Sequence, residues 1–178
     1  MVRAISLALL LGVGMILPTA PILAADSPSG LPLPRFVTTR STPLNVRVGP
    51  GTRYEVAWVY VKEGVPVEII QEFDTWRKIR DLDGAEGWVH QNLLSGVRAG
   101  YVAPDKTEQN FPIRSGMSDE SGVRAYLTPG FRVQIDECDG TWCEVSATST
   151  PPEGRPSTYS GYLRQASLWG VYEGEVFD

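Results

Sequence analysis

The sequence contains two copies of one unit, and this internal repeat limits the fold more than any other feature. At an offset of 66 residues, "YVKEGVPVEII" (60–70) matches "YLTPGFRVQID" (126–136), which places Tyr60 on Tyr126 and Trp76 on Trp142. At an offset of 67, "VRVG" (46–49) matches "IRSG" (113–116), and at 74 "GWVHQNLL" (87–94) matches "GYLRQASL" (161–168). Such self-similarity indicates that one small unit folds twice.

Each copy has the pattern of short strands separated by turns. In "VPVEII", Val65, Val67 and Ile69 alternate with other residues and fall on one face, and no helical periodicity is sustained anywhere. Five short strands in about 60 residues favour a small curled barrel. The second copy is longer by eight residues, which lie in the Ser-, Thr- and Pro-rich segment 146–160. We expect an extended hairpin loop there.

The stretch "LNVRVGPGTRY" (44–54) holds glycines that could bind a phosphate or form a turn. A dinucleotide site needs G-x-G-x-x-G followed by a helix, and neither the third glycine nor the helix is present. The following "EVAWVYV" is rich in β-branched and aromatic residues, which favour a strand. We therefore interpret 49–51 as a turn in a barrel loop.

The N-terminal segment predicts export. Arg3 precedes an apolar run (4–17), and small residues follow before Asp26. This is typical of a cleaved secretory signal peptide over residues 1–25, so we expect a periplasmic or secreted protein without membrane insertion. A Pro-rich linker (26–35), barrel 1 (36–95) and barrel 2 (96–178) follow, the last with a C-terminal strap.

Cys138 and Cys143 are the only cysteines, and "DG" lies between them. In an exported chain this spacing favours a disulfide across a tight hairpin. A redox pair usually has the spacing C-x-x-C, which is absent here.

The charge argues against nucleic acid as a partner. The whole chain has a net charge of −5, and residues 96–178 are more acidic than residues 36–95. Nucleic-acid affinity depends on many lysine and arginine contacts to phosphates.

The motifs "LNVRVGPGTRY", "EGVPVEII", "TWRKI" and "GWVHQNLL" resemble the bacterial SH3 (SH3b) domain. With the "CDGTWC" hairpin and the "LWGVYEGE" tail, the whole of 35–177 resembles exported tandem SH3-like proteins of the alphaproteobacterial type. The resemblance implies an all-β fold of two tandem small SH3-like β-barrels and the wall-targeting function that such units have beside hydrolases. The second copy departs from the pattern, because "FPIRSGMSDESG" has lost the Gly-Pro-Gly turn.

No catalytic or metal site is expected, and no cofactor. His90 is the single histidine and has no second ligand at metal spacing, so we interpret it as a rim residue. The "DLDGAE" segment (81–86) lacks the spacing of a calcium loop. The acidic residues near the second hairpin, 136–144, are expected to be solvated. We therefore expect a protein that is not an enzyme.

Aromatic residues are the remaining candidates for a binding groove, which we predict to contain Arg47, Tyr54, Trp58, Trp76 and Trp88. On "AWVYV" we expect the small aliphatic residues to face the core and Trp58 and Tyr60 to face outward. Packing against barrel 2 or the tail is the alternative for each aromatic residue. Arg47 could pair with a ligand carboxylate or with an acidic residue across the sheet.

These observations predict a cell-envelope binding module that recognises peptidoglycan peptide. The alternative is a protein-protein adaptor or a structural component of an envelope complex, with an envelope protein as partner. The ligand, the number of binding barrels and the oligomeric state are left open.

Overall fold

The computed structural model describes residues 27–178 except residue 108, so the predicted signal peptide lies outside the described residues. Barrel 1 contains β1 (Arg35–Thr39), β2 (Leu44–Arg47), β3 (Val56–Tyr60), β4 (Pro66–Phe73), β5 (Trp76–Arg80), β6 (Glu86–His90), the 3-10 turn η1 (Gln91–Leu93) and β7 (Leu94–Ser95). Barrel 2 contains β8 (Ala99–Val102), β9 (Phe111–Arg114), β10 (Val123–Leu127), β11 (Arg132–Asp139), β12 (Trp142–Ser149), β13 (Ser157–Arg164), η2 (Gln165–Ser167), β14 (Leu168–Trp169) and β15 (Val176–Phe177).

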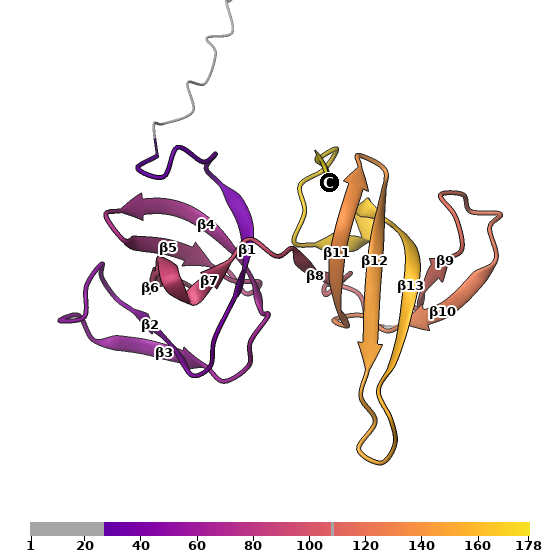
Figure 1. Cartoon of the computed structure of the whole chain (residues 1–178), viewed down its shortest axis with the longest axis horizontal. Coiled ribbons are helices and arrows are strands. Elements are labelled where there is room, and N and C mark those ends of the chain that lie inside the picture. Colours follow the sequence, from indigo (N-terminus) through magenta and orange to yellow (C-terminus); the bar gives the residue numbers. More distant parts are fainter. Residues whose placement is uncertain (1–26, 108) are drawn as a thin grey trace, which may run out of the picture.

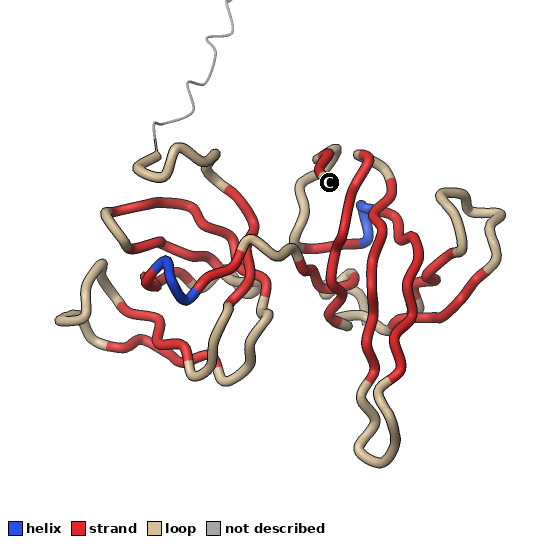
Figure 2. Tube along the Cα trace, viewed as in Figure 1, coloured by secondary structure: helices blue, strands red, loops and turns tan. Residues whose placement is uncertain are grey.

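The two barrels have the same topology, which confirms the all-β tandem fold (Figure 1). The strand order is β3-β2-β6-β5-β4-β1-β7 in the first sheet and β10-β9-β13-β12-β11-β8-β14 in the second. Figure 2 shows that each described helical segment is one short turn, located just after β6 or β13. No helix in the described part of the chain is both long and apolar enough to cross a membrane.

Each barrel has its own core, which is formed by the inward-facing residues of its strands. Equivalent strands supply equivalent residues: Val46 and Ile113, or Ile79 and Val145, are fully buried in their respective barrels. Glycine recurs where the strands approach most closely. A Cβ on Gly87 would overlap Val46 and reach Trp58, so the "GWV" glycine is required by close packing.

The predicted offset is wrong by one residue at the third strand of each unit. Tyr60 pairs with Leu44 in barrel 1, and the residue in that place in barrel 2 is Leu127, which pairs with Phe111. Tyr126 is therefore not the counterpart of Tyr60 and is 66% exposed. The bulge in each strand pair keeps the offset of 67, and the offset becomes 66 only between β3 and β4 in barrel 1 and between β10 and β11 in barrel 2.

The prediction of which side chains of β3 face the core is also wrong. Trp58 and Tyr60 pack against the core of barrel 1, whereas Val59 is 42% and Val61 75% exposed. Burial raises the pKa of Tyr60 to about 12, and its hydroxyl bonds to Asp81 at 3.3 Å. Strand alternation separates the two faces but does not say which is inward, and here the large aromatic rings close the barrel.

The disulfide between Cys138 and Cys143 is present and joins the ends of β11 and β12. The turn between them is fixed by Asp139, whose carboxylate accepts hydrogen bonds from the backbone N–H groups of Thr141 and Trp142. Beyond the barrel, β12 and β13 pair through Ser149 and Ser157, so the inserted segment extends the hairpin away from barrel 2 (Figure 1).

The described part of the Pro-rich linker contacts barrel 1. Ser29 donates from its backbone N and its hydroxyl to the Glu72 carboxylate, at 2.9 and 2.8 Å. Arg35 and Arg77 lie 2.6 and 3.1 Å from the same carboxylate, whose side chain is fully buried. Burial would raise the pKa of Glu72, but the hydrogen bonds from Arg35 and Ser29 hold it below its usual value.

The C-terminal strap joins the barrels. The ring of Phe36 in barrel 1 lies 5.2 Å from Trp169 and 4.9 Å from Tyr172, centroid to centroid. The Tyr172 hydroxyl donates to Glu68 of barrel 1 at 2.8 Å. The end of the strap returns to barrel 2, where β15 pairs with β11.

Candidate ligand-binding site

The outward side of β2, β6 and β5 carries five side chains that we call the aromatic face: Arg47, Trp76, Lys78, Trp88 and His90. Trp88 stands opposite Arg47 on one side and Lys78 on the other, and Trp76 stands opposite His90. Directly opposed residues on one side of a sheet have Cβ atoms about 5 Å apart, so these side chains form one continuous surface. All five are partly exposed.

Three contacts position the rings and the charged groups of this face. The Trp76 and His90 rings meet edge to face, with centroids 5.6 Å apart. His90 Nδ1 accepts a hydrogen bond from the Asn92 N–H at 3.3 Å, so a neutral ring carries its proton on Nε2, which can donate to a ligand. Lys78 pairs with Glu86 at 2.5 Å.

The first loop of barrel 1 is tied to the aromatic face through Arg47. Arg47 Nη1 donates to the backbone oxygen of Tyr54 at 2.6 Å. The Tyr54 ring occupies the space that a side chain on Gly49 would need, since a Cβ there would lie 2.5 Å from the ring. The glycines of "GPG" therefore make room for Tyr54, which agrees with a turn. The expected cross-strand ion pair of Arg47 is absent among the described residues.

The structure brings together part of the predicted groove. Arg47, Trp76 and Trp88 lie on the aromatic face, and Tyr54 lies in the adjoining loop. Trp58 lies on the opposite, inward side of the sheet. Sequence reasoning missed Lys78 and dismissed His90, although the alternation in "WRK" and "WVH" places both on the same side as the tryptophans.

Barrel 2 has an equivalent face, which differs from the aromatic face in its side chains and in their contacts. Arg114, Trp142, Glu144, Tyr162 and Arg164 occupy the five positions by strand pairing. Arg114 Nη1 donates to the oxygen of Ser121 at 2.9 Å, which repeats the bond from Arg47 to its own loop.

A carboxylate from the first loop of barrel 2 covers this second face. Asp119 accepts hydrogen bonds from Nη2 and Nε of Arg164, the latter at 3.4 Å, and lies 3.8 Å from Arg114 Nε. The Arg164 guanidinium lies 4.1 Å from the centre of the Trp142 ring, which is only 6% exposed. The hydrogen bond from Arg164 lowers the pKa of Asp119. The face of barrel 2 is thus occupied by its own residues.

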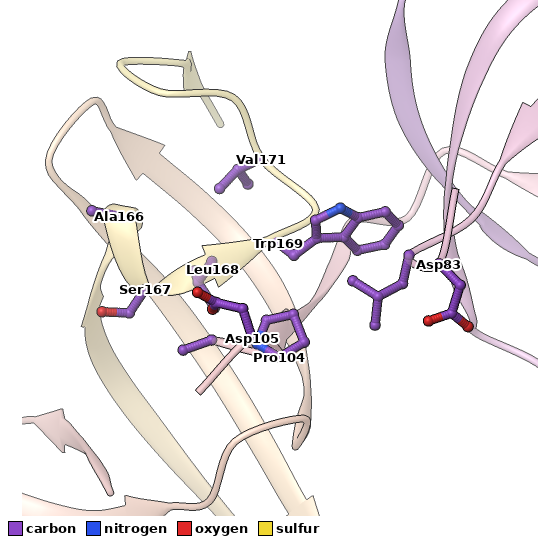
Figure 3. Close-up of a pocket in the computed structure, with 10 residues that line it drawn as sticks. Asp83, Pro104, Asp105, Ala166, Ser167, Leu168, Trp169 and Val171 are labelled. Atoms are coloured by element: carbon purple, nitrogen blue, oxygen red, sulfur yellow. The ribbon is translucent and has the colours of Figure 1, made fainter. Parts of the chain in front are cut away.

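A cleft of about 490 Å³ lies between the barrels and contains none of the five predicted groove residues. Leu82 and Asp83 contribute from barrel 1, and Pro104, Asp105 and Trp169 from barrel 2. Figure 3 shows the Trp169 ring pointing from barrel 2 toward the part of barrel 1 that carries Asp83. Among the described residues, no three His, Cys, Asp or Glu side chains are grouped to hold a metal ion.

A family model described as the bacterial SH3 domain matches residues 40–96 and 107–151, which together exceed half of the chain. The chain belongs to the bacterial SH3 domain family. The two matched segments of this bacterial SH3 protein fall one in each barrel, so both barrels carry the family pattern.

Six chains among the solved structures match as well, and two of them come from Trichomonas vaginalis. The structure of NlpC2 from Trichomonas vaginalis is 13% identical, with a TM-score of 0.31, over 76% of this chain and 48% of that one. The structure of NlpC1 from Trichomonas vaginalis is 15% identical, with a TM-score of 0.31, over 84% and 50%. The matches therefore involve about half the length of these two proteins. A search of curated proteins found no match.

Proposed function

We propose that this protein is a non-enzymatic binding module of the cell envelope, periplasmic or secreted, that recognises peptidoglycan peptide through the aromatic face of barrel 1. One observation carries the proposal: Trp76 is partly exposed in barrel 1, whereas its counterpart Trp142 in barrel 2 is 6% exposed beneath Arg164, which Asp119 holds in place. Two copies with the same topology thus differ in whether the same surface is available to a ligand.

The chemistry of the open face suits a short peptide. Trp88 offers a flat, half-exposed ring with cations on both sides, Arg47 and Lys78. Aromatic rings bind small apolar side chains, and cations bind peptide carbonyl and carboxylate groups. A peptidoglycan stem peptide combines small side chains with such groups.

A non-enzymatic role agrees with the state of the reactive residues. Cys138 and Cys143 are joined in a disulfide and cannot act as nucleophiles. His90 uses Nδ1 to cap the turn η1, which leaves one ring nitrogen for contact with a ligand.

Co-sedimentation with purified peptidoglycan sacculi tests the proposal. Trp88→Ala should abolish retention, while Tyr162→Ala, the same change at the equivalent position of barrel 2, should preserve it. Thermal unfolding of both variants shows whether they fold. Equal retention of the two variants, at the level of the wild type, would exclude barrel 1 as the binding site.

A second candidate function is that of a protein-protein adaptor, favoured by the projecting hairpin of β12 and β13. Beside it lies a groove of about 370 Å³ lined by Tyr126 and Tyr159, which are 66% and 45% exposed. An adaptor should ignore sacculi and co-purify with an envelope protein, and Tyr126→Ala with Tyr159→Ala should release that protein.

A further inference from the structure

We propose that the aromatic face of barrel 1 binds a free carboxylate of its ligand between Arg47 and His90, in the place that Asp119 takes in barrel 2. The proposal rests on the proposed function and specifies the chemical group that the face selects. Its basis is the repeat itself, because barrel 2 shows a carboxylate seated on the same surface.

The residues around Asp119 have direct counterparts in barrel 1. Arg114 and Arg47 end equivalent strands, and each donates to the backbone oxygen of the residue seven positions later. Arg164 stands opposite Trp142, as His90 stands opposite Trp76. The two groups that surround the Asp119 carboxylate therefore correspond to Arg47 and His90.

The seat of the carboxylate is a surface position. The Asp119 side chain is 54% exposed, although it bonds to Arg164 and lies 3.8 Å from Arg114 Nε. A loop residue reaches this position from outside the sheet, so a ligand lying on the sheet can reach it in barrel 1.

Barrel 1 provides the hydrogen-bond donors, but has no carboxylate at the position of Asp119. Its loop between β2 and β3 (48–55) contains two charged residues, Arg53 and the exposed Glu55, and Thr52 takes the place of Asp119 at the offset of 67. Arg47 uses Nη1 for the Tyr54 oxygen and has no ion pair in the described part of the chain, so Nε and Nη2 can bind an anion. His90 can add its Nε2–H.

This arrangement distinguishes an acid from an amide. A carboxylate accepts from both Arg47 and His90, whereas a carboxamide has one acceptor oxygen and no charge. The residue that bears the carboxylate would pack against Trp88, which stands opposite Arg47. The ligand class is therefore a peptide that ends in a small residue with a free carboxylate.

A nitrogen-15 NMR titration of residues 26–178 with N-acetyl-D-alanyl-D-alanine, and with its C-terminal amide, tests the selection. The acid should shift the Trp88 indole N–H signal and bind at least about tenfold more tightly than the amide, the factor expected for a hydrogen bond to a charged group. Arg47→Gln and His90→Phe should each raise the dissociation constant of the acid by about tenfold. Arg114→Gln removes the same loop bond in barrel 2 and should leave binding unchanged.

Asp119→Asn provides the second arm of the test. This change frees Arg114 and Arg164, so the acid should then also shift the Trp142 indole signal. Equal binding of acid and amide, or no response of Trp142 in this variant, would overturn the proposal. If sacculi are retained while acid and amide bind equally, only the carboxylate site is wrong. If the acid is selected while sacculi are not retained, only the peptidoglycan proposal is wrong.

Discussion

Tyr172→Phe should weaken the joint between the barrels, by which we mean the contact of Tyr172 in the strap with Phe36 and Glu68 of barrel 1. The change should preserve the aromatic packing there. The Tyr172 hydroxyl donates to Glu68 Oε1 at 2.8 Å, and its ring lies 4.9 Å from that of Phe36, centroid to centroid. Glu68 is 6% exposed, and its other oxygen accepts from Arg80 at 2.9 and 2.5 Å. Phenylalanine thus removes one donor from a nearly buried carboxylate that keeps its arginine.

The expected loss is about 1.5 kcal/mol, the lower end for a hydrogen bond to a charged group, because Arg80 still compensates the charge of Glu68. In a chain of this size the melting temperature should fall by about 3–6 °C. Burial and the bond to Glu68 raise the pKa of Tyr172 above its usual value. The contribution is therefore fully present below pH 10 and declines only as the pH rises through the folded-state pKa.

Thermal unfolding followed by circular dichroism measures this difference at pH 7 and pH 9, where it should be equal. Tyr126→Phe is the matched control, because Tyr126 is 66% exposed and should not change the melting temperature. If Tyr172→Phe melts together with this control, the hydroxyl does not stabilise the joint and the reasoning fails.

Three further predictions concern stability. Replacing Cys138 and Cys143 together by alanine should cost about 2 kcal/mol in the free energy of unfolding, measured by urea denaturation, because the closed loop is short; an unchanged midpoint would argue against this. Gly87→Ala should cost about 1–3 kcal/mol through overlap with the core, whereas Gly96→Ala, with nothing within 4 Å, should be neutral in the same assay. The lowered pKa of Glu72 means that its stabilisation is present above pH 4.5 and is lost as the pH falls through the folded-state pKa. The difference in melting temperature between wild type and Glu72→Gln should therefore shrink from pH 7 to pH 3, and a constant difference would contradict the assigned ion pairs.

The sequence was sufficient to predict the repeat, the all-β class and the disulfide, because each depends on local spacing. Val67 and Val133, for example, match at a fixed offset and are both fully buried. The facing of Trp58 could not be predicted, because both sides of "AWVYV" are apolar and alternation does not say which side is inward.

The difference between the aromatic face and its counterpart in barrel 2 depends on contacts between residues that are distant in the sequence. Asp119 reaches Arg164 across 45 positions of the chain, and no local pattern in the sequence links the two residues. The joint of Phe36 with Tyr172 is of the same kind, because it links the two ends of the described chain. Local pattern analysis carries no information on such pairs.

Binding of peptidoglycan peptide by the aromatic face of barrel 1 is tested by the amount of protein that purified sacculi retain for wild type, Trp88→Ala and Asp119→Asn. We expect that sacculi retain more Asp119→Asn than wild type, because this change frees the second face, and that they do not retain Trp88→Ala. Equal retention of all three proteins, or none, would contradict the claim that the open aromatic face of barrel 1 binds peptidoglycan peptide.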